Sequence, residues 1–196
     1  LRENQKAKSC FEKVIEIDPN YAKAHNNLGI IFQELRENQK AKSCFEKVIE
    51  IDSNFANAHN SLGFMFASLG EYQKAKSCFE KAIEIDPTYS SAHYNLGIIF
   101  KESGENQKAI SCYEKTIELN PSHKEAHNSL GIVYGVVNNQ KKSINHFHKA
   151  LANRSDIDFK IYKEKDQELR PATSSFFLEL TNKCNFHCEF CPSDSQ

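Results

Sequence analysis

The chain has 196 residues, with 25 basic and 26 acidic side chains and a formal net charge of −1 at pH 7. This balance gives no electrostatic case for binding nucleic acid. No apolar run approaches the ~18 residues that a membrane-spanning helix needs, and no signal peptide opens the sequence, so no membrane partner is expected. We expect a cytoplasmic protein.

Most of the sequence repeats with a period of 34 residues. Residues 1–18 are identical to residues 35–52. A leucine–glycine pair marks every unit, at Leu28–Gly29, Leu62–Gly63, Leu96–Gly97 and Leu130–Gly131. A fixed period of this length indicates stacked repeats that share a continuous core between neighbours.

Each unit predicts two helices joined by a polar turn. In the first complete unit, one amphipathic stripe precedes Arg36–Asn38 and a second one follows it. The stripes consist of Ala24, Leu28, Ile31 and Phe32, and then of Ala41, Cys44, Phe45, Val48 and Ile49. Proline cannot continue a helix, so Pro19, Pro87 and Pro121 are expected to end second helices, with a softer stop at Ser53.

These repeats resemble the tetratricopeptide repeat family. The resemblance rests on the glycines named above, on an alanine at Ala7, Ala41, Ala75 and Ala109, and on an aromatic residue at Phe11, Phe45, Phe79, Tyr113 and Phe147. It implies an all-α solenoid of helical hairpins, a right-handed superhelix, over residues 1–155. Its expected units are a half-repeat, 1–21, and the repeats 22–55, 56–89, 90–123 and 124–155. In the last unit Gly135–Asn139 replaces the usual turn, as a capping repeat allows.

Two residue types recur once per repeat and could suggest metal binding. Cysteine is a small, readily buried hydrophobe, so packing is expected for Cys10, Cys44, Cys78 and Cys112. Histidine stands where the family often has tryptophan, at His25, His59, His93 and His127. Adjacent repeats hold these histidines about one repeat-width apart, so we expect helix packing and no metal ladder.

The family resemblance also implies a concave surface lined by the first helices. An asparagine side chain offers a donor and an acceptor, which matches the paired groups of an extended peptide backbone. We therefore predict a peptide-binding groove at Asn26, Asn27, Asn60, Asn95 and Asn128. Residues 24–29 are similar to units of the O-linked N-acetylglucosamine transferase superhelix, in which an asparagine ladder holds peptides. Here the ladder alternates as Asn27, Ser61, Asn95 and Ser129. The alternative is a solvated polar groove without a fixed ligand.

The sequence changes character after the repeats. Residues 156–174 are charged and aperiodic and are expected to form a linker. Ser175–Thr181 is apolar and aromatic and predicts a buried strand. Three cysteines follow within eight residues, at Cys184, Cys188 and Cys191. Soft thiolate ligands select zinc or an iron–sulfur cluster, and three ligands would leave one iron of a four-iron cluster open.

This segment resembles the radical S-adenosylmethionine (SAM) superfamily, through the C-x3-C-x2-C spacing after a first strand and the aromatic Phe190 before the third cysteine. The resemblance implies a [4Fe-4S] cluster on the three cysteines, SAM on the open iron, and Phe190 beside the cofactor. Residues 175–196 would then be the truncated start of an α/β partial barrel. A structural zinc site using His187 or an outside ligand is an alternative, and a disulfide is another.

The sequence as a whole supports one main hypothesis. It is an N-terminal fragment of a radical SAM iron–sulfur enzyme whose superhelix recruits a peptide or protein, and the fragment itself is expected to be inactive. The alternative is a non-enzymatic interaction scaffold with a structural metal-binding cysteine tail. A repeat-bearing glycosyltransferase has support from the repeats alone.

Overall fold

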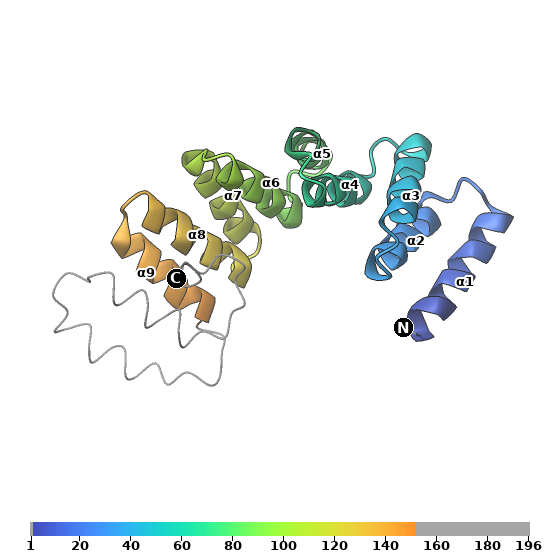
Figure 1. Ribbon diagram of the computed structural model, residues 1–196, viewed down its shortest axis with the longest axis horizontal. Helices are drawn as coiled ribbons and strands as arrows, with labels where there is room; N and C mark the ends of the chain where they lie inside the picture. The colour runs from blue at the N-terminus through green and yellow to red at the C-terminus, as the bar shows by residue number, and fades with distance from the viewer. Residues whose placement is uncertain (1, 152–196) are drawn as a thin grey trace, which may run out of the picture. The chain divides into compact units, whose positions relative to one another are not determined.

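A computed structural model describes residues 2–151, which form nine α-helices and no strand (Figure 1). The helices follow one another in chain order, from α1 in blue to α9 in orange. Their bounds are α1 (Arg2–Ile17), α2 (Ala22–Glu34), α3 (Asn38–Ile51), α4 (Ala56–Ser68), α5 (Tyr72–Ile85), α6 (Ser90–Glu102), α7 (Asn106–Leu119), α8 (Lys124–Val136) and α9 (Gln140–Leu151). The expected linker and cysteine segment lie outside the described residues.

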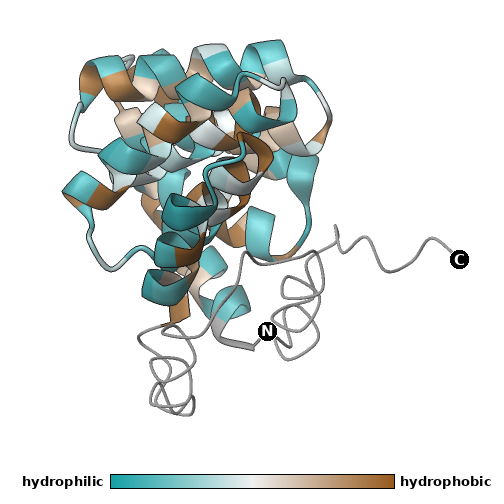
Figure 2. Ribbon diagram, turned by 90° about the vertical axis from the view of Figure 1, so that its left-hand side faces the viewer, coloured by the Kyte–Doolittle hydropathy of each residue, from teal (hydrophilic) through white to brown (hydrophobic). Residues whose placement is uncertain are grey.

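The helices pack as hairpins that stack on their neighbours. Within a repeat the first helix packs on the second, as α2 on α3, α4 on α5, α6 on α7 and α8 on α9. Each second helix also contacts the first helix of the next repeat, and α1 takes that role for α2. The helices carry both hydrophobic and hydrophilic residues (Figure 2). The all-helical repeat architecture predicted from the 34-residue period is therefore confirmed for the described residues.

The turn within each hairpin has the same backbone in all four repeats. One residue adopts a positive φ at a fixed position, at Arg36 (60°), Gly70 (75°), Gly104 (74°) and Asn138 (58°). The next amide donates to a carbonyl five residues back, as Glu37 does to Phe32 at 2.8 Å and Asn139 to Tyr134 at 2.8 Å. These bonds form a Schellman motif that closes the first helix. The divergent sequence Gly135–Asn139 thus keeps the usual turn, because asparagine tolerates the left-handed conformation.

The turn between repeats is held by the recurrent histidine. Its Nε2 atom lies within hydrogen-bond distance of the carbonyl oxygen six residues earlier. The pairs are His25 with Pro19 (2.9 Å), His59 with Ser53 (3.0 Å), His93 with Pro87 (2.9 Å) and His127 with Pro121 (3.2 Å). The bond persists at Ser53, where proline is missing. These four histidines therefore fix the angle at which the chain enters each first helix.

A glycine and an aromatic ring set the spacing inside each hairpin. A Cβ atom added to Gly29 would lie 2.7 Å from Phe45 Cε1, and one on Gly63 would lie 2.7 Å from Phe79 Cε1. A Cβ atom on Gly97 would come equally close to Tyr113, and one on Gly131 would come equally close to Phe147. Such a contact leaves no room for a side chain at the glycine position of the first helix. The rings of Phe45, Phe79 and Tyr113 are almost fully buried there and form the centre of the shared core.

A second set of rings links one repeat to the next. Phe32, Phe66 and Phe100 each lie between two lysine ammonium groups, one from the preceding second helix and one from the repeat's own. The pairs are Lys8 with Lys40, Lys42 with Lys74 and Lys76 with Lys108, at 5.2 to 5.4 Å from the ring centroid. Cation–π contacts of this kind are worth about 0.5–1 kcal/mol at exposed sites.

We expect opposite effects from two alanine substitutions in α8. Alanine favours a helix over glycine by about 1 kcal/mol, but overpacking a core costs about 1–3 kcal/mol. At Gly131 the new methyl would lie 2.8 Å from the Phe147 ring, whereas at Gly135 its nearest neighbour is Ser143 Oγ at 3.5 Å. Gly131→Ala should therefore lower the urea midpoint, and Gly135→Ala should leave it unchanged or raise it. Equal midpoints for the two variants would contradict the close packing.

Candidate functional site

The first helices share a face that we call the first-helix face. It is defined by two positions one helical turn apart, which lie on the same side of a helix. The first position is polar, at Asn26, Asn60, Tyr94 and Asn128, and the second is apolar, at Ile30, Phe64, Ile98 and Ile132. The pattern repeats on α2, α4, α6 and α8, so every repeat presents one polar and one apolar group to this face.

Two of the predicted groove residues bind each other. The Nδ2 atom of Asn95, on α6, donates to Oδ1 of Asn60, on α4, at 2.9 Å. Close by, Asn57 donates to the Tyr89 hydroxyl at 3.1 Å. The first bond joins neighbouring repeats, the second ties α4 to the residue that precedes α6, and α4 and α6 are in direct contact. Asn60 and Asn95 therefore link the second and third complete repeats.

The first repeat has the same asparagine without such a link. Asn26 is 6% exposed, and its Oδ1 atom has no hydrogen-bond partner within the described part of the chain. The position equivalent to Asn95 is Ser61, whose hydroxyl reaches Asn57 Oδ1 at 3.5 Å. The alternation of asparagine and serine thus leaves Asn26 with an unused acceptor. Asn27 is exposed beside it, and Asn128 on α8 is half-buried.

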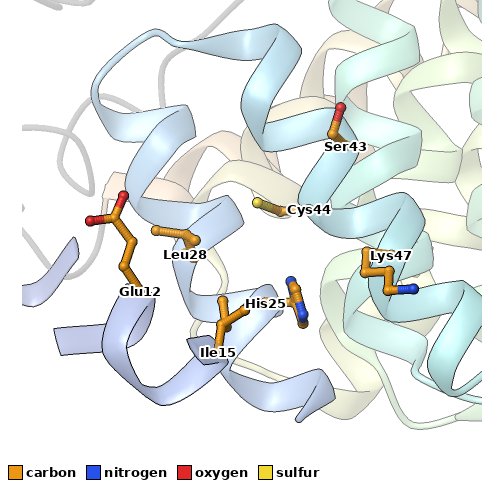
Figure 3. A pocket seen from close by; sticks show the side chains of 7 residues that line it. All are labelled: Glu12, Ile15, His25, Leu28, Ser43, Cys44 and Lys47. Carbon is orange, nitrogen blue, oxygen red and sulfur yellow. The ribbon is translucent and has the colours of Figure 1, made fainter. Parts of the chain in front are cut away.

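The recurrent cysteines lie beside the core. Cys44 lines an open hollow of about 340 Å³ together with Glu12, Ile15, His25, Leu28, Ser43 and Lys47 (Figure 3). Burial raises the pKa of the Cys44 thiol to about 11, and it raises that of Cys112 to about 11 as well. Such thiols stay protonated and are poor nucleophiles at neutral pH. Cys44, Cys78 and Cys112 pack against the core clusters, as expected, whereas Cys10 is exposed.

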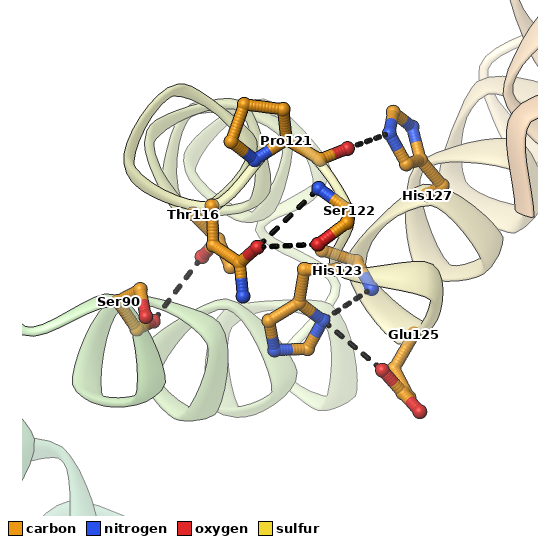
Figure 4. A network of polar contacts seen from close by, with 9 residues as sticks. Ser90, Thr116, Pro121, Ser122, His123, Glu125 and His127 are labelled. Carbon is orange, nitrogen blue, oxygen red and sulfur yellow. Dashed lines mark hydrogen bonds and ion pairs between the residues drawn. The ribbon is translucent and has the colours of Figure 1, made fainter.

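The last repeat has a histidine, His146, where the others have these cysteines. Its Nδ1 atom lies 3.1 Å from Nδ1 of the buried His127. His127 uses its Nε2–H for the carbonyl of Pro121 (Figure 4), so its Nδ1 accepts and His146 Nδ1 donates. Burial lowers the pKa of both rings. The pKa of His146 falls to about 4. Burial is the larger cause, and repulsion from a positive charge on His127 adds to it.

The predicted cluster residues Cys184, Cys188, Cys191 and Phe190, with His187, lie outside the described residues. Among residues 2–151 there is no group of three or more histidine, cysteine, aspartate or glutamate side chains that could hold a metal ion. Within the same residues, no helix combines the length and the apolar character that crossing a membrane requires.

Comparisons with known proteins match the repeats. Models described as tetratricopeptide repeat match residues 1–21, 22–55 and 54–122. A crystal structure of MamA shares 28% identity, covering 81% of this chain and 89% of that one, with a TM-score of 0.65. The structure of PilF from Pseudomonas aeruginosa shares 20% sequence identity, covering 92% of this chain and 84% of that one, with a TM-score of 0.75. The thermophilic TPR protein TTC0263 of Thermus thermophilus shares 18% sequence identity, covering 85% of this chain and 91% of that one, with a TM-score of 0.65. No curated protein sequence matches the chain.

The histidine pair predicts a pH-dependent last repeat. A folded-state pKa below the unfolded value of about 6.5 means that the unfolded chain binds more protons at mildly acidic pH. The stability from this pair is therefore complete above pH 6.5 and is lost as the pH falls toward 4. His146→Cys, which restores the residue of the other repeats, should flatten the change in melting temperature between about pH 7 and pH 5. An unchanged pH dependence in this variant would contradict the assignment.

Proposed function

The chain belongs to the tetratricopeptide repeat family, and from that premise we propose that its repeats mediate a protein–protein interaction by holding an extended segment of a partner along the first-helix face. An extended segment carries unpaired backbone N–H and C=O groups at regular intervals. Side-chain amides can pair with both kinds of group. The partner is thus a protein or peptide, and the repeats act as its recruiting surface.

The observation that carries this proposal is the unpaired acceptor of Asn26. Leaving a buried acceptor without a partner costs about 1–3 kcal/mol. A backbone N–H of a bound segment would remove that cost by displacing the side chains that cover the Oδ1 atom, and Asn27 stands exposed beside it to contact the same segment. Asn60 and Asn95 serve instead to link repeats, so the first repeat offers the free amide groups.

The test uses peptides selected from a random 12-residue display library on the immobilised chain. A selected peptide should bind in fluorescence anisotropy, and Asn26→Ala combined with Asn27→Ala should weaken it at least 10-fold. The melting temperature should not fall, since the change removes an unpaired buried group. Gln39→Ala, an exposed amide on α3, is the matched control and should bind normally. Failure to enrich any peptide over an unrelated protein would refute the proposal.

We also propose that residues 175–196 begin a radical SAM domain, which would make the parent protein a cytoplasmic iron–sulfur enzyme. The support is the C-x3-C-x2-C spacing of Cys184, Cys188 and Cys191 after an apolar strand pattern. Three thiolates fit a [4Fe-4S] cluster with one iron open for SAM, and the bound pair would supply radical chemistry. The repeats would then bring a peptide or protein to that enzyme. The alternative is an interaction scaffold whose cysteines hold a structural metal.

Anaerobic reconstitution with iron and sulfide tests the cluster. The chain should gain visible absorption, and the triple variant Cys184→Ala, Cys188→Ala, Cys191→Ala should lose it. The matched control changes Cys44, Cys78 and Cys112 to alanine and should keep it, because burial raises the pKa of these thiols and holds them protonated. Absorption retained by the first triple variant, or zinc displacing iron at equal stoichiometry, would refute the radical SAM assignment.

A further inference from the structure

The apolar position of the first-helix face is open to solvent in two of the four repeats. Phe64 on α4 is 50% exposed and Ile132 on α8 is 42% exposed, while Ile30 and Ile98 are half-buried. On α8 the face continues one turn further to Val136, which is 64% exposed. Single exposed apolar residues are common on protein surfaces. Phe64 and Ile132, however, occupy the same repeat position. Ile30 and Ile98 occupy it too and pack partly against the core clusters, so an apolar side chain recurs on this face from helix to helix.

The charges of the first helices cancel. No residue of α4 is an acid, a lysine or an arginine. On α6 the two charged residues are Lys101 and Glu102, which form an ion pair at 3.0 Å. On α2 and α8 there is again one lysine and one glutamate each. Glu34 of α2 accepts a hydrogen bond from Asn4 at 2.8 Å, and Glu125 of α8 lies 3.2 Å from His123 (Figure 4).

This cancellation limits what the face can bind. Recognition of a carboxylate or phosphate group relies on arginine or lysine side chains that converge on it. The two positions of the face are occupied by amides, a phenol and apolar groups, so they provide no such cluster. An uncharged ligand loses no hydration of its own charges when it binds there, whereas a charged one does.

We propose that the first-helix face selects an extended, uncharged peptide segment whose alternate side chains are apolar. In an extended chain alternate side chains lie on one side. Those side chains would cover Phe64, Ile132 and their equivalents, while the backbone stays within reach of the polar positions of the same face. The inference rests on the proposed peptide-binding function and adds the chemical class of the partner.

The test compares three blocked 12-residue peptides by fluorescence anisotropy. One alternates leucine with glutamine, the second replaces leucine by serine, and the third replaces glutamine by glutamate. The leucine–glutamine peptide should bind at least 10-fold more tightly than either of the others. Phe64→Ser and Ile132→Ser should each weaken it at least 5-fold. Tyr72→Ser is the matched control on α5, since Tyr72 is 44% exposed outside this face, and it should bind like the unmodified chain.

The outcomes separate this inference from the proposed function. If peptides bind and depend on Asn26 and Asn27, but the three compositions bind equally, the selectivity inference is wrong and the peptide-binding proposal stands. If no peptide binds, both are wrong. If the unmodified chain sediments as a dimer that Phe64→Ser converts to a monomer, the first-helix face is a contact between copies of the chain. This result too would overturn the inference.

Discussion

The contact between a glycine and an aromatic ring is the constraint on which the hairpins depend. Because the Phe45 ring fills the space where a side chain of Gly29 would lie, the Gly29 side of α2 must face α3. Residues of a helix are offset by ~100°, which places Asn26 and Ile30 ~60° and ~100° around from Gly29, to the same side. The contact between the glycine and the ring thus also fixes the direction in which the first-helix face points.

The sequence period predicted this architecture well, and a few local features could not be predicted from it. The repeated glycine and aromatic positions indicate where the helices meet, because they carry the packing. The turn at Asn138 is not predictable from its residues, which differ from those of the other turns, although its backbone is the same. The Asn60–Asn95 bond depends on how neighbouring repeats are placed, which no single repeat encodes. The cysteines at 184, 188 and 191 remain a prediction from spacing alone.

Contacts outside the core couple each repeat to the next. Phe66 is held between Lys42 of one repeat and Lys74 of its own, so its surroundings require both repeats to be folded. Around Tyr134, the equivalent ring of the last repeat, this arrangement changes. The buried Ile110 of α7 occupies the position from which the earlier second helices supply a lysine. Tyr134 keeps Lys142 and donates its hydroxyl to Glu114 at 2.8 Å. A hydrogen bond and a buried aliphatic side chain here take the place of the second cation.

Positions that hold the fold and positions that can meet a ligand differ in how they vary along the array. Glycine and the turn-binding histidine are the same in all four complete repeats, because each has a geometric role that few residues can fill. The polar position of the first-helix face varies more. Tyr94 replaces asparagine there, and its ring packs 5.7 Å from Tyr113 and 4.8 Å from His123. The third repeat therefore uses this position for packing. Since Asn60 is also occupied by Asn95, the amide groups left for a ligand lie toward the two ends of the array, with the exposed Phe64 between them.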